Sequence, residues 1–117
     1  MIGLDRLMEK PGVVAAGQFT EEGKFERAVG DLNEKMKEEV AKLCASVNET
    51  ASKASDKLAE TTNMKWEGLN GWVIWGGDYA LCVSGNIGVF VEASRVDFNQ
   101  MMVDLFGPPA AGQQATN

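Results

Sequence analysis

Apolar and polar residues alternate along the chain with two different periods, which separates strands from helices. A period of two is typical of a half-buried strand, and a period near 3.6 is typical of an amphipathic helix. Glycine- and asparagine-containing turns separate the segments. The expected elements are, in order, a helix over 2–9, strands over 13–19 and 24–29, a helix from 31 to about 60, strands over 72–75, 79–83 and 87–92, and a helix starting at 94. This order, α-β-β-α-β-β-β-α with short turns between successive strands, predicts an α+β fold in which helices pack against an antiparallel sheet.

Two capping boxes mark where the longer helices are expected to begin. Asp31 can accept hydrogen bonds from the first turn of the long helix, and Glu34 stands three residues later. Ser94 and Asp97 repeat this spacing before the final apolar stretch. The sequence therefore predicts Asp31 and Ser94 as the capping residues of these two helices.

The long helix carries an apolar stripe whose residues recur every three or four positions: Met36, Val40, Leu43, Val47, Ala54 and Leu58. At 1.5 Å per residue this helix is roughly 40 Å long, whereas a domain of this size has a radius of gyration of about 13 Å. Its second half is rich in alanine and serine, and small residues suit close packing against another helix. A second copy of the chain is the economical partner, which predicts a homodimer. A frayed, solvated helix end is the alternative.

Composition and charge argue against several kinds of partner. The chain has 117 residues, of which 44% are hydrophobic and 24% are charged, and this balance fits one soluble domain. Its net charge of −6 disfavours binding to nucleic acid and to anionic membrane surfaces. No apolar run approaches the roughly 18 residues of a membrane span, and charged residues interrupt the first ten positions, so no secretory signal is expected. We therefore expect a cytoplasmic protein without nucleic-acid or membrane partners.

Residues needed for common kinds of catalysis are missing from the sequence. The chain has no histidine, which excludes Ser-His-Asp and Cys-His catalysis within one chain and removes the commonest metal ligand. Its two cysteines, Cys44 and Cys82, do not form a C-x-x-C pair, and no segment has the spacing of a phosphate-binding loop. The sequence therefore predicts no catalytic residue, no metal site and no cofactor, and we expect the protein not to be an enzyme.

The two cysteines differ in the roles that their positions suggest. Cys82 lies in the middle of an expected strand, where a buried structural thiol is the usual role. Cys44 lies beside the apolar stripe of the long helix, so in an antiparallel pair of helices it could approach its copy. A redox-sensitive crosslink between two copies is therefore a second interpretation of Cys44.

Several short motifs follow one another in an order that is specific when they are taken together. They are Leu4-Asp5-Arg6-Leu7-Met8, Pro11-Gly12-Val13, Ala15-Ala16-Gly17, Gly30-Asp31-Leu32, Gly71-Trp72, Gly76-Gly77-Asp78-Tyr79, Cys82, Gly85-Asn86-Ile87-Gly88-Val89-Phe90-Val91-Glu92 and Asp97-Phe98-Asn99. With the order of elements, these motifs resemble the Roadblock/LC7 superfamily, and more closely the DUF2173 family of uncharacterised prokaryotic proteins. The resemblance implies a profilin-like domain over residues 1–107, with a five-stranded antiparallel sheet between helices. Residues 108–117 are expected to form a disordered tail.

The same resemblance implies a function in protein interaction. Roadblock-like domains are typically non-catalytic, and many homodimerise through the long helix and the third strand. In this sequence, the residues that correspond to such an interface are Met36, Val40, Leu43, Val47, Trp72, Ile74 and Trp75. Relatives bind small Ras-like GTPases or scaffold larger complexes, so the resemblance implies a regulator or scaffold with a small GTPase as its possible partner.

The strand over 72–75 agrees with this interpretation. An uncovered Trp-Val-Ile-Trp edge promotes aggregation, and pairing with a second copy removes the free edge. Trp72 and Trp75 are three residues apart, so a regular strand turns them to opposite sides of the sheet. One of them is expected in the core, and the other is expected at an interface or exposed.

A small-molecule sensor is the alternative function. Profilin-like sheets in other families hold ligands between the sheet and the helices, and the small residues Ala15, Ala16 and Gly17 could leave room for one. An enclosed cavity of roughly several hundred Å³ with converging polar groups would favour this alternative.

Overall fold

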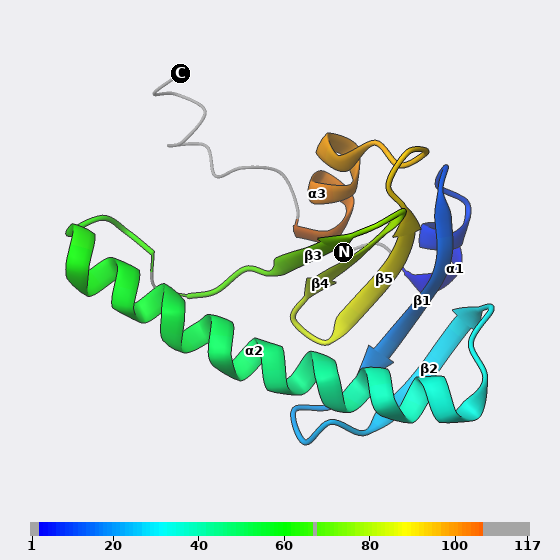
Figure 1. The fold of residues 1–117 in the computed structure, drawn as a ribbon, viewed down its shortest axis with the longest axis horizontal. Coiled ribbons are helices and arrows are strands. Elements are labelled where there is room, and N and C mark those ends of the chain that lie inside the picture. The colour runs from blue at the N-terminus through cyan, green and yellow to red at the C-terminus, as the bar shows by residue number, and fades with distance from the viewer. Residues whose placement is uncertain (1–2, 67, 107–117) are drawn as a thin grey trace.

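Five strands form one antiparallel sheet in the order β2-β1-β5-β4-β3, and helices lie against both of its faces (Figure 1). The computed structural model describes residues 3–66 and 68–106. Its elements are α1 (Leu4–Met8), β1 (Val13–Phe19), β2 (Phe25–Gly30), α2 (Glu34–Thr62), β3 (Trp72–Gly76), β4 (Tyr79–Ser84), β5 (Ile87–Glu92) and α3 (Phe98–Phe106). The predicted order of helices and strands and the α+β fold class are confirmed. The predicted tail over 108–117 lies outside the described residues.

Each face of the sheet has its own hydrophobic core, because side chains alternate between the two faces along a strand. Leu7 of α1 and Met101 of α3 pack with Cys82 on one face. On the other face, Cys44 of α2 packs with Leu81. Successive residues of β4 therefore point into different cores, and five of its six residues are buried.

The helix α2 is the longest element and extends past the sheet at its C-terminal end (Figure 1). It has 29 residues, and the longest dimension of the molecule is 43 Å. The helix ends with Asn63 in the left-handed conformation. Its predicted end near residue 60 is therefore close to the observed one, and the helix is as long as the whole domain.

Both predicted helix caps are wrong by a few residues. Asn33, and not Asp31, caps α2, because its side chain accepts a hydrogen bond from the backbone N–H of the residue three positions later at 2.9 Å. The chain still turns at Gly30, whose carbonyl accepts a bond from the N–H of residue 32, so the helix begins later. Asp97, and not Ser94, caps α3 by accepting a bond from the N–H of Gln100 at 3.1 Å. The residues before it form a turn in which two N–H groups share the carbonyl of residue 92.

Candidate functional site: the outer side of α2 and the edge strand β3

The apolar side chains of α2 form two lines that face different surroundings. Ala41 and Cys44 are buried against the sheet. Met36, Leu43 and Leu58 are exposed, and Leu43 has 49% of its surface accessible. Residues seven positions apart, such as 36 and 43, face nearly the same direction on a helix with 3.6 residues per turn. The helix therefore turns small side chains to its own sheet and larger ones to solvent.

The strand β3 is an edge strand that pairs with β4 along one side. Ile74 lies opposite Leu81, which belongs to the core beneath α2, whereas Trp75 lies opposite Ala80, which belongs to the core beneath α1 and α3. Exposure is 46% for Ile74 and 69% for Trp75. In the part of the chain that the structure describes, no strand pairs with the other edge of β3. This edge therefore offers both backbone hydrogen-bonding groups and exposed apolar side chains.

The seven residues predicted at the interface fall into three groups in the folded chain. Those exposed on the α2 side of the molecule are Met36, Leu43 and Ile74. The half-buried residues are Val40, Val47 and Trp72. Of these, Val40 and Trp72 pack against the core beneath α2. The remaining residue, Trp75, is exposed on the opposite face of the sheet. The two tryptophans thus face opposite sides, as predicted, with one against the core and the other in solvent.

Asn48 links α2 to the edge strand, which sequence reasoning missed. Its side-chain oxygen accepts a hydrogen bond from the indole N–H of Trp72 at 2.6 Å. Its side-chain amide donates to the carbonyl of Gly85, in the turn between β4 and β5, at 2.9 Å. In the sequence, Asn48 stands four positions after Cys44, and residues four apart lie on the same side of a helix. This spacing places a polar side chain on the side of α2 that faces the sheet, and it could have indicated the contact. This side chain fixes the position of α2 relative to β3.

Both cysteines are buried within their own chain. Cys44 is 1% exposed and faces the sheet, and Cys82 is buried in the other core. Burial raises the pKa of each thiol to about 11 from an ordinary value of 9.0. The approach of Cys44 to its copy across a helix pair is therefore wrong for this fold, because its thiol points away from the outer side of α2.

The thiols of the native protein are expected to react about 100-fold more slowly at pH 8 than unfolded cysteines, because a pKa near 11 leaves so little thiolate. Unfolded thiols ionise near pH 9 and the buried ones near pH 11, so the folded state should also lose stability as pH rises through this range. Reaction rates with a chromogenic disulfide, measured in buffer and in concentrated urea, check the expectation. Rapid modification of Cys44 in the native protein would contradict its burial.

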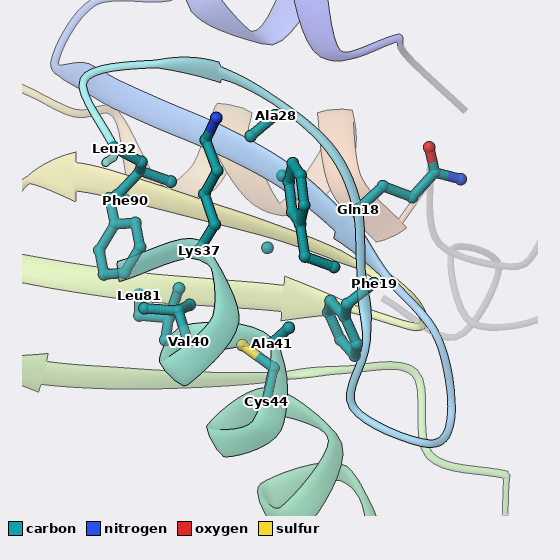
Figure 2. A pocket seen from close by; sticks show the side chains of 13 residues that line it. Gln18, Phe19, Ala28, Leu32, Lys37, Val40, Ala41, Cys44, Leu81 and Phe90 are labelled. Atoms are coloured by element: carbon teal, nitrogen blue, oxygen red, sulfur yellow. The ribbon is translucent and has the colours of Figure 1, made fainter. Parts of the chain in front are cut away.

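The space between α2 and the sheet is a small apolar cavity (Figure 2). Its volume is about 30 Å³, which is room for about one water molecule. Lys37 is one of the residues that line it, and its ammonium group lies 5.2 Å from the centre of the Phe25 ring and 3.1 Å from a carboxylate oxygen of Glu34. The cation is thus already partnered, and the cavity is far below the size typical of a ligand pocket. This geometry gives no support to the small-molecule sensor.

The acidic residues do not gather into a metal site in the described chain. Among residues 3–66 and 68–106, no three or more His, Cys, Asp or Glu side chains are grouped so that they could hold a metal ion. None of the described helices combines the length and the hydropathy that crossing a bilayer requires.

Comparisons with known proteins identify a family and a fold. The family described as "Uncharacterized conserved protein (DUF2173)" matches residues 3–106. A Roadblock/LC7 domain from Streptomyces avermitilis has a similar structure, with a TM-score of 0.72 and 14% identity over 84% of this chain and 80% of that one. The gliding protein mglB from Thermus thermophilus is similar with a TM-score of 0.55 and 17% identity over 89% of this chain and 76% of that one. No functionally curated protein matches the sequence.

Proposed function

The chain belongs to the DUF2173 family and has a Roadblock/LC7-like fold, and from these findings we infer that it is a non-catalytic, homodimeric protein-interaction module that regulates or scaffolds a partner. The observation that carries the proposal is the line of large apolar side chains on α2 that its own sheet does not cover. Met36, Leu43 and Leu58 are exposed on this helix. Exposed apolar surface of this kind is typical of an interaction site.

The proposed dimer joins two β3 edges and places the outer sides of two α2 helices against each other. Strand pairing gives hydrogen-bond partners to the free backbone groups of β3 and removes an edge that promotes aggregation. Ile74 lies on the α2 side of the sheet, so the same contact can cover it together with Leu43. The Trp75 side chain lies on the other face of the sheet, where pairing of two β3 strands would bring side chains of the second strand beside it.

The proposed partner of the dimer is a small GTPase. This part of the proposal rests on the resemblance to Roadblock/LC7 proteins, whose dimers bind Ras-like GTPases, and on the shared fold. It predicts that a Ras-like GTPase of the source organism binds the dimer with different affinities when loaded with GDP and with a GTP analogue. Calorimetric titration of both forms measures this difference, and no binding of either form would limit the proposal to a scaffold without a GTPase.

Light scattering tests the homodimer. Wild-type protein is expected at twice the 12.6 kDa of one chain at micromolar concentrations, and Leu43→Glu and Ile74→Lys are each expected at the mass of a monomer. A charge at either position would have to be buried without a partner in the dimer, which is strongly unfavourable. Both side chains are exposed in the single chain, so the variants should remain folded by circular dichroism.

Arg27→Glu is the matched control for this experiment. It also changes the charge of an exposed residue, but it lies in β2, at the opposite edge of the sheet from β3. This variant should remain a dimer. A monomeric wild-type protein, or loss of the dimer in the control as well, would overturn the proposed interface.

A further inference from the structure

Trp75 is an exposed tryptophan on the face of the sheet opposite α2. Its side chain is 69% exposed and lies on the face of the sheet that α1 and α3 cover. One side of the indole packs against Phe98 of α3, with the ring centres 5.7 Å apart and the planes tilted by 39°. Pairing of two β3 strands would place side chains of the second strand beside the indole and would leave the side of the ring that points away from the sheet open. An aromatic ring held in place by one neighbour and open to solvent is a preorganised contact surface.

An open groove of about 480 Å³ lies beside Trp75, at the end of the sheet where the β3–β4 turn meets the loop after β5. Tyr79, which is 55% exposed, lines it together with the acidic residues Asp78 and Glu92. The carbonyl of Asp78 accepts a hydrogen bond from the N–H of Ala93 at 2.9 Å, so the turn and the loop are held together. The groove therefore combines two exposed aromatic rings with two carboxylates on a fixed backbone.

The charge of this groove favours a cation. Residues 68–94 contain Asp78 and Glu92 but no lysine or arginine. Arg95 lies next to the groove, and its guanidinium is 3.3 Å from a carboxylate oxygen of Glu92, so a ligand cation must share this carboxylate with Arg95. Among the described residues, no cation forms an ion pair with Asp78. The chain as a whole carries a net charge of −6, which further favours a basic ligand.

We propose that this groove binds a basic segment of a partner protein and seats one of its arginine or lysine side chains between Trp75 and the carboxylates of Asp78 and Glu92. Cations bind over the faces of aromatic rings, with tryptophan as the best acceptor and arginine as the more frequent cation. Tryptophan, tyrosine and arginine are also the residues enriched where interface energy is concentrated. The groove supplies a tryptophan and a tyrosine, and its negative charge favours an arginine from the partner. Every group comes from one chain, so the inference does not depend on the proposed dimer.

A titration with synthetic peptides tests this site. The probe is a nine-residue capped peptide, Leu-Arg-Lys-Leu-Arg-Leu-Lys-Arg-Leu, and its control has glutamine at each arginine and lysine. Binding is followed in ¹⁵N-labelled protein through the indole N–H signals of Trp66, Trp72 and Trp75, which tryptophan-to-phenylalanine variants assign. The basic peptide should shift the Trp75 signal. It should leave the Trp72 signal in place, because the indole N–H of Trp72 is bonded to Asn48. The glutamine peptide should shift neither signal.

Matched variants separate this groove from general attraction to an acidic surface. Asp78→Asn combined with Glu92→Gln should raise the Kd of the basic peptide about fivefold, as expected for exposed ion pairs and cation–π contacts. Glu21→Gln combined with Glu22→Gln removes the same charge at the exposed turn after β1 and should leave the Kd within about twofold. An unchanged Trp72 signal shows that each variant is folded.

Two outcomes would overturn the proposal. One is a Trp75 signal that does not move when the basic peptide is added. The other is an equal loss of affinity in the two double variants, since this would mean that net charge alone attracts the peptide. Neither outcome bears on the proposed dimer, whose test is the mass in solution.

Discussion

Replacing Gly30 by alanine should lower the free energy of unfolding by about 3 kcal/mol, the combined cost of a strained backbone and an overpacked contact. Gly30 ends β2 with a φ of 99°, a conformation that side chains rarely allow. A Cβ atom at this position would lie 2.6 Å from the Cα of Ala15 and 2.6 Å from the carbonyl oxygen of Val14. Both atoms belong to the backbone of β1, so neither can move aside without disturbing the pairing of the two strands.

Gly17→Ala is the matched control for this substitution. It lies in β1 opposite Ala28 of β2, its φ is not positive, and its new methyl group would meet neighbours at ordinary distances of 3.6 Å. This variant should change stability by no more than about 0.5 kcal/mol, as is usual for substitutions away from special positions. Urea unfolding of both variants measures the difference. Equal stability of the Gly30 and Gly17 variants would show that the turn before α2 does not require glycine.

Asn48→Ala is expected to destabilise the protein by about 2 kcal/mol, from the loss of two hydrogen bonds worth about 1 kcal/mol each. The substitution leaves the indole N–H of the half-buried Trp72 and the carbonyl of Gly85 without this partner. Because one bond connects α2 to β3 and the other connects α2 to the β4–β5 turn, the two elements of the proposed interface should also become less well fixed relative to each other. The Trp72 indole signal is expected to move and broaden.

A double-mutant cycle separates the Trp72 bond from other effects of this change. Asn48→Ala and Trp72→Phe, made singly and together, should show a coupling of about 1 kcal/mol in urea unfolding, since the two residues share one hydrogen bond. Ser46→Ala, at an exposed position of the same helix, is the control and should leave stability within about 0.5 kcal/mol. Additive effects of the two substitutions would contradict the direct link between α2 and β3.

The sequence predicted the strands and their first residues well, and the first residues of the helices less well. The strands over 13–19 and 87–92 were predicted with the observed bounds, because alternation and glycine-containing turns define them locally. The cap of α2 moved from Asp31 to Asn33 because the chain is still turning after Gly30, where it passes close to β1. A capping box describes only local hydrogen bonds, and here the packing of β2 against β1 decided where the helix starts.

The sequence by itself determined the fold class, the apolar stripe of the long helix, and the opposite orientation of Trp72 and Trp75, because all three depend on local periodicity. Only the tertiary structure decided which side of α2 is covered. The small residues Ala41 and Cys44 allow the helix to approach its sheet closely, and this turns the larger Leu43 outward. The tertiary structure also decided that Trp75 borders an acidic groove. Asp78 lies in the β3–β4 turn and Glu92 lies at the end of β5, so the two carboxylates meet only when the sheet forms. Periodicity orders residues along one element, but contacts between elements depend on how their surfaces pack.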